Sequence, residues 1–220
     1  MICLVTDRSR LSAGTDNIDR LVDLVAAAGR AGIDLVQIRE RDLEARALVS
    51  LVRRCVKAVE GTGTRVVVND RADVAVAAGA DGVHLRGDSM AAPAVRTLVG
   101  EGALIGRSVH TAAEAAAAHG AGGVDYCIFG TLYPSQSKPP AHPIATLEEL
   151  SAACRAAAGI PMLAIGGMTV ERASEAARAG AAGIAGIGLF VPPRGVSADT
   201  HVRTLVAALR RAFDTCETVS

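Results

Sequence analysis

The chain has 220 residues, half of them hydrophobic, and a formal net charge of zero. This length suits one α/β barrel and is short for two typical domains, so we predict a single domain over residues 1–220. Aromatic residues make up 2% of the chain and no net positive charge would draw a polyanion, which argues against nucleic acid as a partner. No segment approaches the roughly 18 uninterrupted apolar residues of a membrane span, and no signal peptide opens the sequence. We therefore expect a cytoplasmic protein with no membrane contact.

Short β-branched runs alternate with Ala-rich stretches along the whole chain, which is typical of βαβ units in a parallel sheet. We predict eight strands, at residues 2–5, 34–39, 65–69, 82–85, 104–108, 126–130, 162–166 and 183–188. The clearest helices are predicted at residues 18–31, 43–59, 111–119, 147–158, 170–179 and 200–213. Eight strands, each followed by a helix, favour a single (β/α)₈ TIM barrel over an open doubly wound sheet. Residues 214–220 are expected to form a frayed tail.

Two local patterns in the sequence have structural explanations. Thr111 and Glu114 have the TxxE spacing of a capping box at a helix start. Five cysteines are odd in number and lack CxxC or Cys/His metal spacing, which predicts reduced thiols and no zinc site: Cys3, Cys55, Cys127, Cys154 and Cys216.

Polar residues at the ends of the predicted strands are the candidate site residues, because catalytic groups of a barrel lie at that end. Gln37 and Arg39 are two residues apart and so share one face of their strand, whereas Glu40 is expected to face away. An unpaired buried arginine is costly. Arg39 is therefore either an anion ligand, which we favour, or half of an internal ion pair with Asp34 or Asp70.

The next strand ends in Asn69 and Asp70, directly after a fully apolar run. Asp70 is a candidate Mg²⁺ ligand, since this ion is often bound by one or two carboxylates and substrate phosphates. The alternative is that Asp70 caps the following helix. Asp88 is a candidate second carboxylate. Further along, Ser108, His110 and His84 also end apolar runs, although a lone histidine is more often structural.

Residues 130–140, GTLYPSQSKPP, combine several hydroxyls with one lysine after an apolar strand. Ser135, Ser137 and Lys138 suit a phosphate or pyrophosphate better than a carboxylate, because lysine is a point charge without a bidentate fork. A solvated loop is the alternative, since these are ordinary turn residues. Gly166, Gly167, Gly186 and Gly188 would let backbone amides approach a ligand after strands seven and eight, where barrels often bind phosphate.

The order and spacing of seven motifs resemble the thiamine phosphate synthase superfamily, which also contains thiazole tautomerases. They are LVTD at Leu4, VQIRER at Val36, VNDRADVA at Val68, ADGVHL at Ala80, IGRSVH at Ile105, FGTLYPSQSK at Phe129 and AIGGM at Ala164. The glycine-rich final strand also fits, so the similarity spans almost the whole chain.

The resemblance implies a transferase that joins hydroxymethylpyrimidine pyrophosphate to a thiazole phosphate and releases pyrophosphate with Mg²⁺. It implies that the residues around the pyrophosphate and pyrimidine are Gln37, Arg39, Arg41, Asn69, Ser108 and Lys138, of which Arg39, Ser108 and Lys138 are the catalytic candidates. It places Asp70 on the metal. The residues that it assigns to the thiazole phosphate side are Ser135, Ser137, Gly167, Ile187 and Gly188.

Three positions depart from the synthase pattern, and a fourth departs from the tautomerase pattern. Arg41 stands where synthases carry lysine, and Ser89 stands where they carry a second metal carboxylate, with Asp88 one residue early. Arg107 resembles the tautomerase branch, yet Thr131 occupies the position of the tautomerase histidine. We therefore lead with the synthase and keep two alternatives, a thiazole tautomerase with proton transfer by another residue such as His110, and a non-catalytic phosphate-binding protein of the thiamine pathway. The sequence also leaves a homo-oligomer open.

Overall fold

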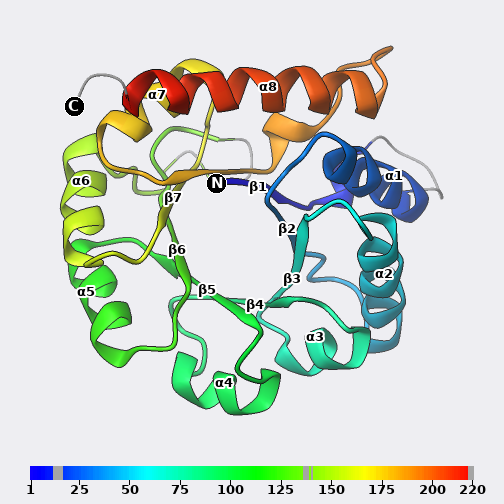
Figure 1. The fold of residues 1–220 in the computed structure, drawn as a ribbon, viewed down its shortest axis with the longest axis horizontal. Coiled ribbons are helices and arrows are strands. Elements are labelled where there is room, and N and C mark those ends of the chain that lie inside the picture. Colours follow the sequence, from blue (N-terminus) through cyan, green and yellow to red (C-terminus); the bar gives the residue numbers. More distant parts are fainter. Residues whose placement is uncertain (12–16, 136–138, 140, 218–220) are drawn as a thin grey trace.

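A computed structural model describes residues 1–11, 17–135, 139 and 141–217, with side chains up to residue 213. Its eight parallel strands pair in sequence order and close into a barrel, so the predicted TIM-barrel fold is confirmed (Figure 1). The strands are β1 (Ile2–Val5), β2 (Leu35–Ile38), β3 (Arg65–Asn69), β4 (Gly82–Leu85), β5 (Leu104–Val109), β6 (Tyr126–Phe129), β7 (Met162–Ile165) and β8 (Gly183–Gly186).

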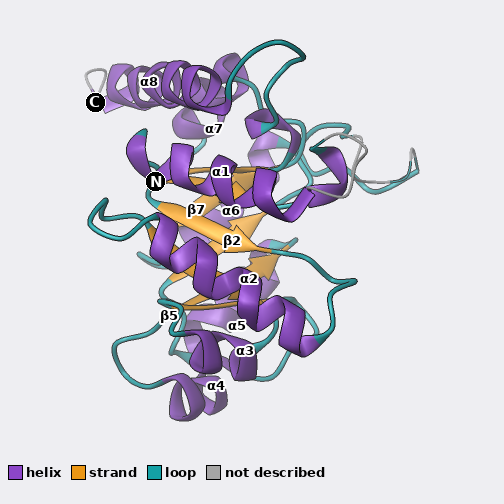
Figure 2. Ribbon diagram, turned by 90° about the vertical axis from the view of Figure 1, so that its right-hand side faces the viewer, coloured by secondary structure: helices purple, strands orange, loops and turns teal. Residues whose placement is uncertain are grey.

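Helices surround the barrel in an outer ring (Figure 1), and the side view shows them packed over the strands (Figure 2). They are α1 (Asn17–Arg30), α2 (Ala45–Ala58), α3 (Ala72–Ala78), α4 (Ala92–Val99), α5 (Ala112–Ala121), α6 (Leu147–Ala156), α7 (Val170–Arg178) and α8 (Ala198–Glu217), with short 3₁₀ helices η1 (Arg8–Arg10) and η2 (Gly188–Phe190). The short helices α3 and α4 were not among those delimited from the sequence, because two turns give little periodicity to detect. Helix α8 continues to Glu217, so part of the expected tail is helical.

The barrel encloses a small apolar cluster, and a larger one separates the strands from the helices. The inner cluster consists of Cys3, Val5, Leu35, Val67, Tyr126, Ile128, Leu163 and Ala185. Gly106 leaves room for it, because a Cβ there would overlap the ring of Tyr126. The cysteines with described side chains are free thiols, as predicted, and burial raises the pKa of Cys3 to about 12. Across the described helices, none is both long and apolar enough for a bilayer crossing.

The capping box predicted at Thr111 forms only in part. The Thr111 hydroxyl accepts a hydrogen bond from the Glu114 amide at 3.1 Å, but the Glu114 carboxylate accepts from the amide of His110, one residue earlier. The complete reciprocal box opens α6 instead, between Thr146 and Glu149. The sequence spacing therefore located the cap correctly and assigned the wrong partner to the glutamate.

Three aspartates fasten neighbouring strands at the amino-terminal end of the barrel. Each precedes a strand and accepts a hydrogen bond from an amide at the start of the strand before it: Asp34 from Ile2 at 2.6 Å, Asp81 from Val66 at 2.7 Å and Asp125 from Ile105 at 2.7 Å. Asp34 also pairs with Arg210 at 2.8 Å. Asp34 therefore joins the start of β2 to the start of β1 and to helix α8. It does not form the ion pair with Arg39 that we considered as an alternative.

Candidate active site

A cavity of about 950 Å³ opens at the carboxyl ends of the strands, the end toward which the β2 arrow points in Figure 2. Its apolar lining includes Val5, Ile128, Ile165 and Ala185. The predicted site residues that line it are Gln37, Arg39, Arg41, Asn69, Asp88, Ser108, Ser135, Gly167, Ile187 and Gly188. Asp70 is not among the lining residues, and Ser137 and Lys138 lie outside the described residues. The closed barrel gathers the ends of its strands, and period-two alternation directs alternate side chains inward, so residues that are distant in sequence meet in this cavity.

The charge around this cavity is strongly asymmetric although the whole chain is neutral. Among the described lining residues, four arginines (Arg10, Arg39, Arg41 and Arg86) face one aspartate, Asp88. A cleft lined by one sign of charge concentrates ligands of the opposite sign. The cavity is therefore suited to a ligand with several negative charges.

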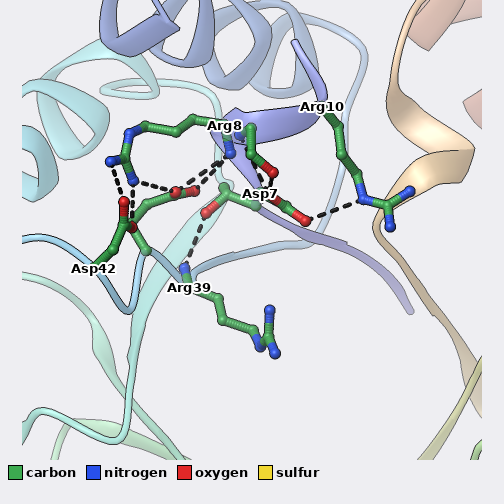
Figure 3. Close-up of polar contacts among 8 residues, drawn as sticks. Asp7, Arg8, Arg10, Arg39 and Asp42 are labelled. Carbon is green, nitrogen blue, oxygen red and sulfur yellow. Dashed lines mark hydrogen bonds and ion pairs between the residues drawn. The ribbon is translucent and has the colours of Figure 1, made fainter. Parts of the chain in front are cut away.

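Arg39 is a partly buried arginine of the cavity. Its backbone amide donates to the Thr6 hydroxyl at 2.9 Å, which fixes the end of β2. Its guanidinium makes no hydrogen bond or ion pair with any described residue and extends into the open centre of the barrel mouth (Figure 3). Burial lowers the pKa of Arg39, and the nearby positive charge of Arg41 lowers it further. A bound anion would compensate for this arrangement.

Glu40, the next residue, faces away from the cavity as expected. Its carboxylate is buried and accepts hydrogen bonds from the Arg8 guanidinium at 3.0 Å and from the Arg8 backbone amide at 3.1 Å. Arg8 also bonds the exposed Asp42 (Figure 3), and this contact raises the pKa of Arg8. The adjacent residues of β2 thus have separate roles, since Glu40 is paired inside the protein and Arg39 is open to a ligand.

Gln37 and Asn69 form a neutral pair beside these charges. The Gln37 amide donates to the Asn69 side-chain oxygen at 2.9 Å, so the two groups fix one another's orientation across β2 and β3. Oriented amides can recognise both donors and acceptors on a flat heterocycle. The pair is therefore suited to the polar edge of a heterocycle.

Ser108 belongs to a buried chain of hydrogen bonds. His84 bonds the Ser108 hydroxyl through Nε2 at 2.9 Å and the Tyr126 hydroxyl through Nδ1 at 3.1 Å. Burial lowers the pKa of His84 to about 3, so the imidazole is neutral at physiological pH. His84 therefore holds Ser108 in place and carries no charge of its own.

This burial predicts an acid-dependent loss of stability. A histidine in the unfolded chain binds a proton near pH 6.5, whereas buried His84 stays neutral until about pH 3, so lowering the pH between these values favours unfolding. We expect the free energy of unfolding to fall by about 1.4 kcal/mol more per pH unit, between about pH 6 and 4, than in His84→Gln. Urea denaturation at several pH values measures both slopes; equal slopes would show that His84 is not responsible.

The two carboxylates considered for Mg²⁺ do not fit an ion held between them. Asp88 is 71% exposed and pairs with Arg86 at 2.8 Å. Asp70 accepts a hydrogen bond from Ser89, and its other oxygen lies 3.8 Å from the same Arg86 guanidinium. Within the described residues, no three His, Cys, Asp or Glu side chains form a group that could hold a metal. The alternative role of Asp70 as a helix cap is not seen either, because Arg71 occupies that position of α3.

The opposite wall of the cavity is built from backbone at the ends of β7 and β8. Gly166 and Gly167 have φ values of 104° and 57°, which favour glycine. A Cβ on Gly167 would lie 2.6 Å from the Pro134 carbonyl oxygen, so glycine lets the loop that carries Ser135 pack closely against this turn. Arg172 bonds the Gly167 carbonyl at 2.5 Å and stacks on Tyr133, which bonds Glu175. Helix α7 therefore anchors both segments of this wall.

Sequence reasoning missed two arginines of the cavity, Arg10 and Arg86. Arg10 lies on η1, a 3₁₀ turn too short for periodicity to indicate which way its side chains point. The Asp7 and Arg10 spacing was the available signal, because these residues form an ion pair at 3.0 Å. Arg86 follows β4 by one residue, and its position after an apolar run was the same signal that identified Arg39.

A closed barrel with a cationic cavity at the carboxyl ends of its strands is typical of TIM-barrel enzymes that bind phosphorylated substrates. The chain belongs to the thiamine monophosphate synthase family, whose sequence model matches residues 2–190. This confirms the family that the motifs indicated.

Individual relatives agree with this assignment. A protein of Geobacter sulfurreducens is 41% identical over 188 residues, covering 86% of this chain and 85% of the relative. The thiamine-phosphate synthase of Roseiflexus castenholzii is 37% identical over 210 residues, 96% of this chain and 89% of its own length. Among solved structures, the thiamine phosphate pyrophosphorylase of Pyrococcus furiosus superposes with a TM-score of 0.79 at 26% identity, covering 98% of this chain and 96% of that one.

Proposed function

We propose that this protein is a thiamine-phosphate synthase, which condenses hydroxymethylpyrimidine pyrophosphate with a thiazole phosphate to give thiamine phosphate and pyrophosphate. The observation that carries the proposal is the half-buried Arg39 guanidinium, which bonds no described residue, in a cavity whose described lining holds four arginines and one aspartate. A leaving pyrophosphate supplies the charge that this cavity lacks. Names of curated relatives support the same reaction.

The reaction requires charge stabilisation more than acid or base chemistry. The thiazole nitrogen forms a bond to the pyrimidine methylene carbon, and the carbon–oxygen bond to pyrophosphate breaks with its electron pair leaving on oxygen. Arg39 and Arg41 would stabilise the negative charge that develops on pyrophosphate. Gln37, Asn69 and Ser108 would orient the pyrimidine, whose ring delocalises the positive charge.

Magnesium stays a prediction for this chain. The family resemblance implies it and Asp70 is retained, but Arg86 engages both Asp70 and Asp88. We assign no step to the metal, and the assay below compares Mg²⁺ with chelator.

Purified protein incubated with both substrates should release pyrophosphate and form thiamine phosphate. Absence of release both with Mg²⁺ and with chelator would refute the synthase. Conversion of the non-aromatic thiazole tautomer would favour the tautomerase, whose expected histidine is replaced here by Thr131, 7% exposed. Binding of both substrates without conversion would favour the non-catalytic alternative.

Lys138→Ala tests the pyrophosphate role assigned to the loop at residues 130–140. Losing one charge-assisted contact should raise the KM for pyrimidine pyrophosphate about 10- to 100-fold. Steady-state kinetics measures this. The matched control is Lys57→Ala, since Lys57 is the other lysine in the sequence and lies exposed in the last turn of α2. Equal KM values for both variants would remove Lys138 from the site.

A further inference from the structure

Arg10 is a cavity arginine that is held on one side and open on the other. It lies on η1, directly after β1, and its Nε donates to Asp7 Oδ2 at 3.0 Å. The other oxygen of Asp7 accepts from the Ser9 amide at 3.2 Å and from the Ser9 hydroxyl at 2.5 Å. Burial would raise the pKa of Asp7, but these bonds outweigh it and lower the pKa, so the carboxylate is charged and fixed. Asp7 therefore orients Arg10 while using only Nε.

The outer nitrogen Nη1 of Arg10 lies beside Gly188, on the cavity wall after β8, the strand that pairs with β1. Neither Nη1 nor Nη2 bonds a described residue, and the side chain is 21% exposed. A Cβ added to Gly188 would lie 3.5 Å from Arg10 Nη1, so the guanidinium lies close to the place that a side chain at residue 188, after β8, would occupy. Figure 3 shows the Arg10 guanidinium beyond Asp7, separate from Arg39 in the centre.

Two groups of cationic side chains therefore serve one cavity. Arg39 and Arg41 follow β2 and influence one another electrostatically, whereas Arg10 lies beside Gly188 on the wall formed after β7 and β8. Gly188 and Gly167 offer backbone without side chains on that wall, which lets an anion approach closely. A guanidinium tethered through Nε still presents two parallel N–H groups, the fork that binds phosphate oxygens.

We propose that Arg10 binds the monophosphate of the second substrate, the thiazole phosphate, and so selects a phosphorylated thiazole over its free alcohol. This inference rests on the proposed synthase function for the identity of the ligand. Arg10 would neutralise the monophosphate at the β7–β8 wall, while the β2 arginines neutralise the pyrophosphate. Each substrate would then have its own cation.

Binding measurements without turnover test this subsite. Calorimetry should show that the wild-type protein binds thiazole phosphate about 10- to 100-fold more tightly than the thiazole alcohol. Arg10→Gln should lose most of that preference, and Arg10→Lys should keep part of it, because a single ammonium cannot bond Asp7 and present a fork to phosphate. Arg20→Gln, whose arginine bonds the Leu11 carbonyl outside the cavity lining, is the matched control.

The outcomes separate this subsite from the overall reaction. If wild-type protein forms no product but Arg10→Gln loses the phosphate preference, the synthase proposal fails and the subsite stands. If turnover is normal and Arg10→Gln retains its KM for thiazole phosphate, the subsite proposal is overturned. A KM rise for pyrimidine pyrophosphate in Arg10→Gln, with thiazole phosphate unaffected, would also overturn it. Thermal melting of each variant checks that it is folded.

Discussion

Replacing Arg39 with glutamine should lower kcat/KM for pyrimidine pyrophosphate about 100- to 1,000-fold, the range expected when a preorganised charge is removed from a developing anion. The same substitution should leave the free energy of unfolding unchanged or slightly higher. This follows because the Arg39 guanidinium is partly desolvated and bonds no described residue, so its removal breaks no internal contact. Steady-state kinetics and urea denaturation measure the two effects.

Arg41→Gln is the matched comparison for Arg39. Both arginines follow β2 and line the cavity, but Arg41 is exposed, so its contribution should be several-fold smaller because of solvent screening. If Arg39→Gln keeps normal kcat/KM, or if it unfolds the protein, Arg39 is not the anion ligand we describe.

Replacing Arg8 with alanine should destabilise the protein, unlike Arg39→Gln. We expect a loss of about 3–5 kcal/mol in the free energy of unfolding, because the buried Glu40 carboxylate would lose its charged partner. The Glu40 side chain is 3% exposed and accepts from both the guanidinium and the backbone amide of Arg8, of which only the amide would remain as a donor. Urea denaturation measures the loss.

Two further variants isolate the Glu40 contact. Asp42→Ala should cost less than about 1 kcal/mol, because Asp42 is 69% exposed although it bonds the same arginine. Adding Glu40→Gln to Arg8→Ala should restore part of the stability, since no buried charge is then left. A loss below 1 kcal/mol in Arg8→Ala would mean that solvent reaches Glu40.

The sequence predicts the barrel well because its signals are local and repeated. Each strand is a short apolar run, and polar residues that end those runs had to converge once the barrel closed. Gln37, Arg39 and Asn69 were placed in the cavity on this basis alone, and the structure brings them together there. Their roles toward substrate stay predictions.

The features that the sequence did not reveal depend on side-chain direction and on contacts between loops. Arg10 required the geometry of a three-residue 3₁₀ turn, and its distance to Gly188 joins opposite ends of the chain. Likewise, the engagement of Asp70 and Asp88 by one arginine depends on where the loop after β4 folds back, with Asp70 at a φ of 60°. No spacing rule encodes such contacts.

The three aspartates at the amino-terminal end of the sheet stabilise the barrel at a distance from the residues that line the cavity. Asp34, Asp81 and Asp125 tie strands together in pairs at the end remote from the cavity, without using any side chain of the mouth. Substitutions of mouth residues that bond no other described part of the protein, such as the Arg39 side chain, can therefore occur without loosening the strands at the closed end. In a scaffold divided in this way, side chains at the cavity can change the chemistry while the contacts at the other end of the strands keep the fold.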